Sequence, residues 1–211
     1  GDEVIVPGLT FIAPAHAARL LGARVRLVDV WPDRPLLNTK RLPAVLTDAT
    51  RMIVPVHLNG RICDVDSARR AAGGAVTILE DCAQAFSSRS GARRAGTAGD
   101  MAAFSMGITK LISTGEGGCV ATNDDELYEA ILLARNHGTY AIADNRFDAL
   151  GFNFKFTDML AGMGLRQVRR REEKITGVTR VYEYYREHLA DLPFCRLLEV
   201  DIENGEVPLW T

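Results

Sequence analysis

Two residues near the middle of the chain have types and settings that suit catalysis. Lys110 follows the apolar run 101–105, lies among small hydroxyl residues and precedes a Gly-rich turn at 115–118. A lysine partly removed from water in such a place has a lowered pKa and can act as a nucleophilic amine. Asp81 follows the apolar run 76–80, so we expect it at the end of a strand. A carboxylate in that position can face a cationic ring nitrogen or a metal ion.

Each of these residues also has an ordinary structural interpretation. A single lysine in a loop is most often a solvated surface residue, and an aspartate after a strand often caps the next helix. Neither residue decides the matter alone. Taken together, an amine that can form a Schiff base and an acid that can face a pyridinium nitrogen are the pair that pyridoxal phosphate chemistry requires.

The elements that position this pair follow from the alternation of short apolar runs with helical stretches. Strands are expected at 3–7, 24–30, 51–57, 76–80, 101–105 and 118–122, and helices at 14–21, 64–72 and 124–136. Short apolar strands separated by helices predict an α/β fold with a largely parallel, buried sheet. Ligands of such sheets collect at the carboxyl ends of the strands, which is where Asp81 and Lys110 are placed.

The pattern changes from residue 157 onward. We expect one long helix or two consecutive helices over 157–167 and 168–189, the first small and apolar, the second strongly charged. The charged run 169–174 (RRREEK) is expected to be a solvated helix face. We therefore expect residues 1–165 to form a large domain and 166–211 to form a linker helix and the beginning of a small domain.

Composition excludes several classes of protein. The chain has 211 residues, with 25 Lys and Arg against 27 Asp and Glu, a net charge of −2. A nearly neutral chain has no electrostatic footprint for nucleic acid or an anionic membrane, and no apolar stretch approaches the roughly 20 residues that span a bilayer. It begins on an apolar run without Met and stops at Trp210-Thr211, so we expect it to be part of a longer protein whose location is cytoplasmic.

The four cysteines predict neither a metal site nor disulfides. Cys63, Cys82, Cys119 and Cys195 are far apart and form no CxxC pair. The first three lie beside apolar or helical segments, so we expect them to be buried, reduced thiols.

Several sequence blocks, in order along the chain, carry a family resemblance. They are GDEVIVPGLTFIAPAHAARLLGARVRLVDV, PVHLNG, ILEDCAQAF, GTAGDMAAFSMGITK, GEGGCVATND, ARNHG and GFNFKFTDMLAGMGLRQ. They cover nearly all of residues 1–190, and the chain thereby resembles the DegT/StrS (DegT/DnrJ) family of pyridoxal phosphate-dependent sugar-nucleotide aminotransferases. The resemblance implies a three-layer α/β large domain of the aspartate aminotransferase fold (fold type I).

The resemblance implies a role for several residues in binding the cofactor. Lys110 matches the catalytic lysine that binds pyridoxal phosphate covalently and moves a proton, and Asp81 matches the acid paired with the pyridine nitrogen. Gln84, expected one helical turn after Asp81, matches a contact to the ring hydroxyl. Phe11 matches the aromatic residue that stacks on the pyridine face, although it could simply be a core residue.

Two further matches concern the cofactor phosphate and the oligomer. Ser105 matches a phosphate ligand, with a strand-end hydroxyl bonded to the backbone as the alternative. Asn153 matches a residue that reaches the phosphate of the neighbouring subunit, and this implies a homodimer with a shared active site; a loop Asn can also serve only its own turn. His57 and His137 are expected to be satisfied structural residues.

The implied reaction transfers an amino group from an amino acid, glutamate, to a keto-sugar nucleotide. Three features depart from the family pattern: Cys82 replaces the usual Ala, Met106-Gly107 stand where an aromatic residue or His is usual, and Phe152-Asn153-Phe154-Lys155 replaces Tyr-Asn-Tyr-Arg. Replacing Arg by Lys at 155 loses a two-pronged anion contact. The phosphate-binding turn that precedes GDEV in the family is absent from this stretch.

Two other functions stay open. Some relatives are sugar dehydratases of the same family, but these carry His in place of the lysine, and Lys110 argues against that reaction. A catalytically silent binding or regulatory module is the alternative from another class, since the phosphate-binding turn is absent.

Overall fold

A six-stranded sheet forms the centre of the protein, for which the computed structural model describes residues 1–209. Its order is β2-β1-β3-β4-β7-β8, and every neighbouring pair is parallel except β7 and β8. The strands are β1 (Glu3–Pro7), β2 (Arg24–Val28), β3 (Thr50–Ile53), β4 (Thr77–Asp81), β7 (Met101–Ser105) and β8 (Gly118–Thr122). The expected α/β fold with a mostly parallel sheet is confirmed.

Helices surround this sheet, and three of the α-helices begin at a residue whose side chain caps the first turn. The α-helices are α1 (Ala13–Leu20), α2 (Val65–Ala72), α3 (Asp125–Arg135), α4 (Asp158–Arg169) and α5 (Arg171–Leu189), and the short 3₁₀ segments are η1 (Thr39–Ala44), η2 (Leu58–Gly60) and η3 (Ile142–Asp144). Asp64, Asp124 and Thr157 cap α2, α3 and α4 by accepting from backbone N–H groups of the first turn. None of the helices within residues 1–209 is long and apolar enough to cross a membrane.

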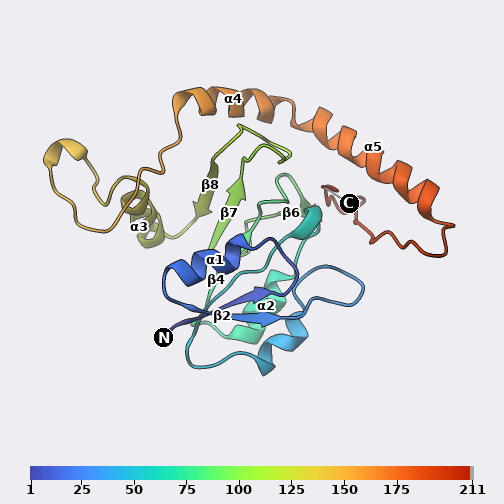
Figure 1. Ribbon diagram of the computed structural model, residues 1–211, viewed down its shortest axis with the longest axis horizontal. Helices are drawn as coiled ribbons and strands as arrows, with labels where there is room; N and C mark the ends of the chain where they lie inside the picture. The colour runs from blue at the N-terminus through green and yellow to red at the C-terminus, as the bar shows by residue number, and fades with distance from the viewer. Residues whose placement is uncertain (210–211) are drawn as a thin grey trace.

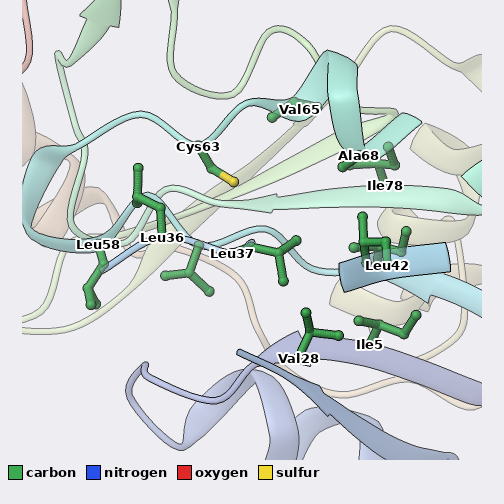
Figure 2. Close-up of a cluster of buried hydrophobic side chains, with 12 residues drawn as sticks. Ile5, Val28, Leu36, Leu37, Leu42, Leu58, Cys63, Val65, Ala68 and Ile78 are labelled. Atoms are coloured by element: carbon green, nitrogen blue, oxygen red, sulfur yellow. The ribbon is translucent and has the colours of Figure 1, made fainter. Parts of the chain in front are cut away.

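The sheet is covered on both faces because side chains alternate along β1. Ile5 packs on one face with residues of β2, β4 and α2, and Figure 2 shows Val65 and Ala68 of α2 on the same side as Ile78. Val4 and Val6 face the opposite side and pack with residues of α1. The sheet is thus a middle layer between α1 and α2.

The last third of the described chain leaves the sheet and then returns to it. In Figure 1, α4 and α5 extend as two consecutive helices past the end of the sheet, and the C-terminal segment runs back toward β6 (Arg93–Arg94). The break between them is at Arg170, whose φ of −99° and ψ of 12° are not helical. Two helices rather than one long helix therefore occupy this region.

The returning segment 198–209 is fixed to the first part of the chain by buried polar groups. Arg61 is 2% exposed and donates from its guanidinium to the carbonyl oxygens of Leu198 at 2.6 Å and Glu199 at 2.7 Å. Burial lowers the pKa of Arg61, and nearby Glu206 opposes this shift. These contacts join positions nearly 140 residues apart in the sequence.

Several local expectations were wrong. The strand expected over 51–57 ends at Ile53, and only Val56 pairs again with β4. The residues after Asp81 form turns instead of a helix and lead to β5 (Arg89–Ser90), which pairs with β6 in a small hairpin. Cys63 and Cys82 are buried as expected, but Cys119 is exposed because it lies on the edge strand β8. Trp210 and Thr211, the end of the expected second domain, lie outside the described residues.

Candidate active site

Asp81 lies at the carboxyl end of β4, at the edge of the sheet where ligands of parallel sheets collect. Its Oδ1 accepts a hydrogen bond from the backbone N–H of Ala83 at 2.9 Å, which fixes the carboxyl group in a local turn. It does not cap a helix, because no helix follows it. Asp81 also lines a mostly apolar cavity of about 450 Å³ between α1 and the sheet.

Lys110 lies in a tight loop that follows β7. Its backbone N–H donates to the carbonyl oxygen of Gly107 at 3.0 Å, and Thr114 N–H closes the loop on Met106 O at 2.9 Å. A second contact comes from α5, where Lys174 Nζ donates to Leu111 O at 3.0 Å. The loop that carries Lys110 is therefore held both by its own turns and by a helix from the far part of the chain.

Lys110 and Asp81 lie within electrostatic reach of each other. Burial lowers the pKa of the Lys110 amine, and the Asp81 carboxylate acts in the opposite direction. Burial raises the pKa of Asp81, while the Ala83 N–H bond and the charge of Lys110 lower it. The structure therefore brings together an amine that gives up its proton more readily than a free lysine and a carboxyl group that faces a cavity.

Ser105 is the last residue of β7 and lines the same cavity as Asp81. Its Oγ accepts a long hydrogen bond from Gly107 N at 3.3 Å, so the backbone-bonded alternative is present in the structure. A Cβ atom placed on Gly107 would lie 3.5 Å from Ser105 Oγ and 4.0 Å from Lys110 Cγ. The side chains of Ser105 and Lys110 therefore both lie next to Gly107.

The amide of Gln84 has a defined orientation. Its Oε1 accepts from the backbone N–H of Asn59 at 2.9 Å, and a backbone N–H can only donate. The Gln84 NH₂ group is therefore the end that can point to a ligand, and it would donate to an oxygen. Asn59 has a φ of 54°, a left-handed backbone conformation that Asn tolerates. Its side-chain Nδ2 donates a hydrogen bond to Leu209 O.

Phe11 and Asn153 are not brought into this cluster by the described chain. Phe11 is 69% exposed, so it is not a core residue; it lies two residues before α1, whose residues line the cavity with Asp81. Asn153 is exposed and pairs through its backbone with Asn136. The segment is fastened there by Lys155, whose Nζ donates to Asn136 Oδ1 at 3.0 Å.

The histidines expected to be structural behave differently from each other. His57 is fully buried and both of its ring nitrogens are bonded, as expected. His137 is half-buried, has a φ of 59°, and its backbone N–H donates to Phe152 O at 2.9 Å.

A second cavity of about 500 Å³ opens beside Lys110 and contains residues that the sequence did not single out. Lys174 and Tyr182 of α5 line it together with Pro208 and Leu209 of the returning segment. No local pattern marks these residues, because they reach Lys110 from 64 or more positions away. The sequence predicts a strongly charged α5 and does not indicate the element against which Tyr182 packs.

Comparisons with known proteins show similarity over nearly the whole chain. The sequence pattern of the DegT/DnrJ/EryC1/StrS aminotransferase family matches residues 1–210 of this chain. GDP-perosamine synthase of Caulobacter vibrioides is 39% identical over 193 residues, which are 91% of this chain and 52% of that protein. The dTDP-3-amino-3,4,6-trideoxy-alpha-D-glucose transaminase of Micromonospora megalomicea is 34% identical, with 95% of this chain and 54% of that protein covered.

A solved structure extends the comparison to three dimensions. The E. coli GDP-4-keto-6-deoxy-D-mannose-3-dehydratase with bound hydrated PLP has a TM-score of 0.87 and 26% identity, covering 98% of this chain and 57% of that one. The chain spans about half the length of the curated relatives it matches. Because the family description matches nearly the whole chain, the chain belongs to the DegT/DnrJ/EryC1/StrS aminotransferase family.

Proposed function

We propose that the protein to which this chain belongs is a pyridoxal phosphate-dependent aminotransferase. It transfers an amino group from an amino acid, glutamate, to a keto-sugar nucleotide. The observation that supports the proposal is that the Lys110 amine and the Asp81 carboxyl group, each of which follows a strand of the sheet, influence each other electrostatically. The names of the relatives, a nucleotide-sugar transaminase among them, support the substrate class.

The residues present fit pyridoxal phosphate by the chemistry of their donors. An amine, a carboxyl group, a hydroxyl and an amide NH₂ are available from Lys110, Asp81, Ser105 and Gln84. In addition, the Oγ1 atom of Thr10, next to Phe11, is buried without a hydrogen-bond partner in the described part of the chain. The residues that line the Asp81 cavity include no Lys or Arg, so this lining offers the Ser105 hydroxyl to a phosphate rather than a cation.

When bound, pyridoxal phosphate supplies an electron-withdrawing ring that stabilises negative charge on the carbon bearing the amino group. In this proposal Lys110 would hold the cofactor and would then accept and return a proton at Nζ, because its lowered pKa favours the neutral amine that can take the proton up. With the cofactor bound, Asp81 would pair with the ring nitrogen and keep it protonated. Gln84 would donate to the ring hydroxyl, Ser105 would bind the phosphate and Phe11 would stack on the ring.

Asn153 is proposed to act in the neighbouring subunit of a homodimer. Its exposure, on a segment fastened by Lys155, leaves its side chain accessible to a second chain. The domain boundary near residue 165 and the cytoplasmic location remain predictions.

The dehydratase reaction is the second candidate, because a sugar dehydratase is among the structural relatives. It keeps the cofactor and changes the fate of the sugar. Lys110 favours amino transfer, since the dehydratases that the chain resembles carry His at this position.

The test uses the full-length protein with added pyridoxal phosphate. Reduction with borohydride should attach the cofactor to Lys110, as read by peptide mass, and incubation with glutamate and a keto-sugar nucleotide should yield an amino sugar. Lys110→Ala should lose both results, whereas Lys40→Arg, an exposed control, should keep them. Label on another lysine would refute the assignment. A protein that stays colourless would favour the silent module, and sugar turnover without amino transfer would favour the dehydratase.

A further inference from the structure

A buried pair of ionisable side chains lies directly behind Asp81 and has no role in the proposed reaction. His57 is fully buried and Glu80 is 1% exposed, and His57 Nε2 lies 2.8 Å from Glu80 Oε2. Glu80 and Asp81 are consecutive residues of β4, so their side chains point to opposite faces of the sheet. The pair therefore lies on the far side of the strand from the Asp81 cavity.

The hydrogen bonds define the protonation of His57. The backbone N–H of Cys63 donates to His57 Nδ1 at 3.0 Å, so Nδ1 is an acceptor and carries no proton. The ring proton is then on Nε2 and is donated to Glu80. His57 is a neutral ring that joins the end of β3 to β4 through a single, directed bond.

Glu80 accepts four hydrogen bonds and leaves neither of its oxygens unused. Gly96 N donates to Oε2 together with His57, and the N–H groups of Ala98 and Gly99 donate to Oε1 at 2.7 and 2.6 Å. Burial alone would raise the pKa of Glu80, but the bonds from His57, Gly99 and Ala98 hold it below its ordinary value. The side chain is an ionised carboxylate wrapped by the loop 96–99.

The same cluster is not well suited to a metal ion. Ligand atoms of His57, Glu80 and Cys82 lie within 4.8 Å of one another. Both ring nitrogens and both carboxylate oxygens are already bonded within the protein, and burial raises the pKa of the Cys82 thiol, which keeps it protonated. The hydrogen-bonded arrangement is the one that the geometry supports.

The backbone connects this pair to Asp81. The N–H of Asp81 donates to Pro55 O at 2.9 Å, and the N–H of His57 donates to Asp81 O at 3.0 Å. Asp81 is thus bracketed by the two backbone bonds that join the end of β4 to the segment after β3, and the His57–Glu80 bond joins the same two segments through side chains. The loop 96–99, bound to Glu80, leads into β7 and so toward Ser105.

We propose that His57 and Glu80 are positioning residues that hold the Asp81 carboxyl group in place for its ligand. That this ligand is pyridoxal phosphate rests on the proposed function. A buried ion with its partner costs desolvation, and an apolar pair would stabilise the fold at least as well. A directed polar pair, in contrast, fixes one register of the two strand ends and therefore one position of the Asp81 carboxyl group. The His57–Glu80 pair therefore contributes to the geometry of the site rather than to the stability of the fold.

Two substitutions at His57 separate the two bonds of its ring. In His57→Gln the side-chain NH₂ can replace Nε2 and still donate to Glu80, while in His57→Asn the side-chain oxygen can replace Nδ1 and accept from Cys63 but cannot reach Glu80. Leu42→Ala is the matched control, because Leu42 is a fully buried core residue on the α2 side of the sheet and its truncation destabilises the fold without touching the pair.

The experiment measures two quantities in the full-length protein. Without cofactor, hydrogen exchange is followed at the N–H groups of Asp81 and Ala83, which bond to Pro55 O and to Asp81 Oδ1. With pyridoxal phosphate, the dissociation constant is measured. His57→Asn should speed exchange at both amides and weaken cofactor binding, each at least tenfold, and His57→Gln should restore both to within threefold of the parent protein.

The outcomes distinguish positioning from general stability. The proposal is wrong if Leu42→Ala, at an equal loss of unfolding free energy, changes amide exchange and cofactor binding as much as His57→Asn does. It is also wrong if His57→Asn changes neither the exchange rates nor the dissociation constant more than twofold. If the parent protein binds no pyridoxal phosphate, the proposed function fails, and the exchange at Asp81 and Ala83 still decides whether the pair positions the strand end.

Discussion

Replacing Glu206 by Gln tests whether the returning C-terminal segment completes the site. Glu206 is 5% exposed and accepts from Arg34 Nη2 and from the backbone N–H of Ile62 through Oε1, and from Asp201 N–H through Oε2, each at 2.8 Å. Gln keeps the size of the side chain but places an NH₂ group against at least one of these donors.

The expected loss follows from counting these bonds. A buried donor left without an acceptor costs about 1–3 kcal/mol, and a hydrogen bond to a charged group is worth roughly 1.5–3 kcal/mol. Arg34 contributes at the lower end, because its side chain is 44% exposed and water screens its charge. We therefore expect Glu206→Gln to lower the free energy of unfolding by about 3 kcal/mol.

The assay is urea unfolding of the full-length protein, with hydrogen exchange at two reporter amides. Val207 N–H is bonded to Ser88 Oγ and Arg89 N–H to Gly205 O, so both report whether the segment is docked. Because 1.36 kcal/mol is a factor of ten, 3 kcal/mol corresponds to roughly a hundredfold faster exchange if the segment opens as a unit. Substrate binding should weaken as well, since Pro208 and Leu209 line the Lys110 cavity.

The control is Glu203→Gln on the same segment, where the side chain is exposed and the expected change is within about 0.5 kcal/mol. If the two variants unfold within 0.5 kcal/mol of each other, and the reporter amides exchange at equal rates, Glu206 does not hold the segment in place.

Three further predictions follow from single contacts. Asp81→Asn should lower the pKa of Lys110 further, because the Asp81 carboxylate favours the ammonium form; the pH profile of reductive methylation at Lys110 measures this, and an unchanged profile would contradict the pairing. Gly60→Ala should destabilise the fold by roughly 2 kcal/mol or more, since φ is +82° and the new Cβ would lie 1.7 Å from a carbonyl oxygen of the returning segment, whereas Gly162→Ala in open space on α4 should stabilise it by about 0.5–1 kcal/mol. A melting temperature that does not fall in Gly60→Ala, or that falls in Gly162→Ala, would refute this prediction. Asp124→Ala should cost about 1 kcal/mol by removing the cap of α3, and a melting temperature equal to that of the parent would show that the cap adds no stability.

The sequence by itself determined the elements and the central pair of residues. Short apolar runs predicted β1, β7 and β8 at their observed bounds, and helices were predicted to begin near residues 64 and 124, where Asp64 and Asp124 are the caps. These signals are local, because a strand or a helix end is set by residues within one or two turns of chain. The order of the parallel strands then placed Asp81 and Lys110 at one edge of the sheet.

Only the tertiary structure decided how that edge is completed. The orientation of the Gln84 amide depends on Asn59, 25 residues away, and the Lys110 cavity is lined in part by Leu209. The burial of His57 against Glu80 likewise requires β3, β4 and the loop 96–99 to be assembled first. Such contacts leave no local pattern, because their free energy comes from desolvation and directed bonds between segments that meet only in the folded chain.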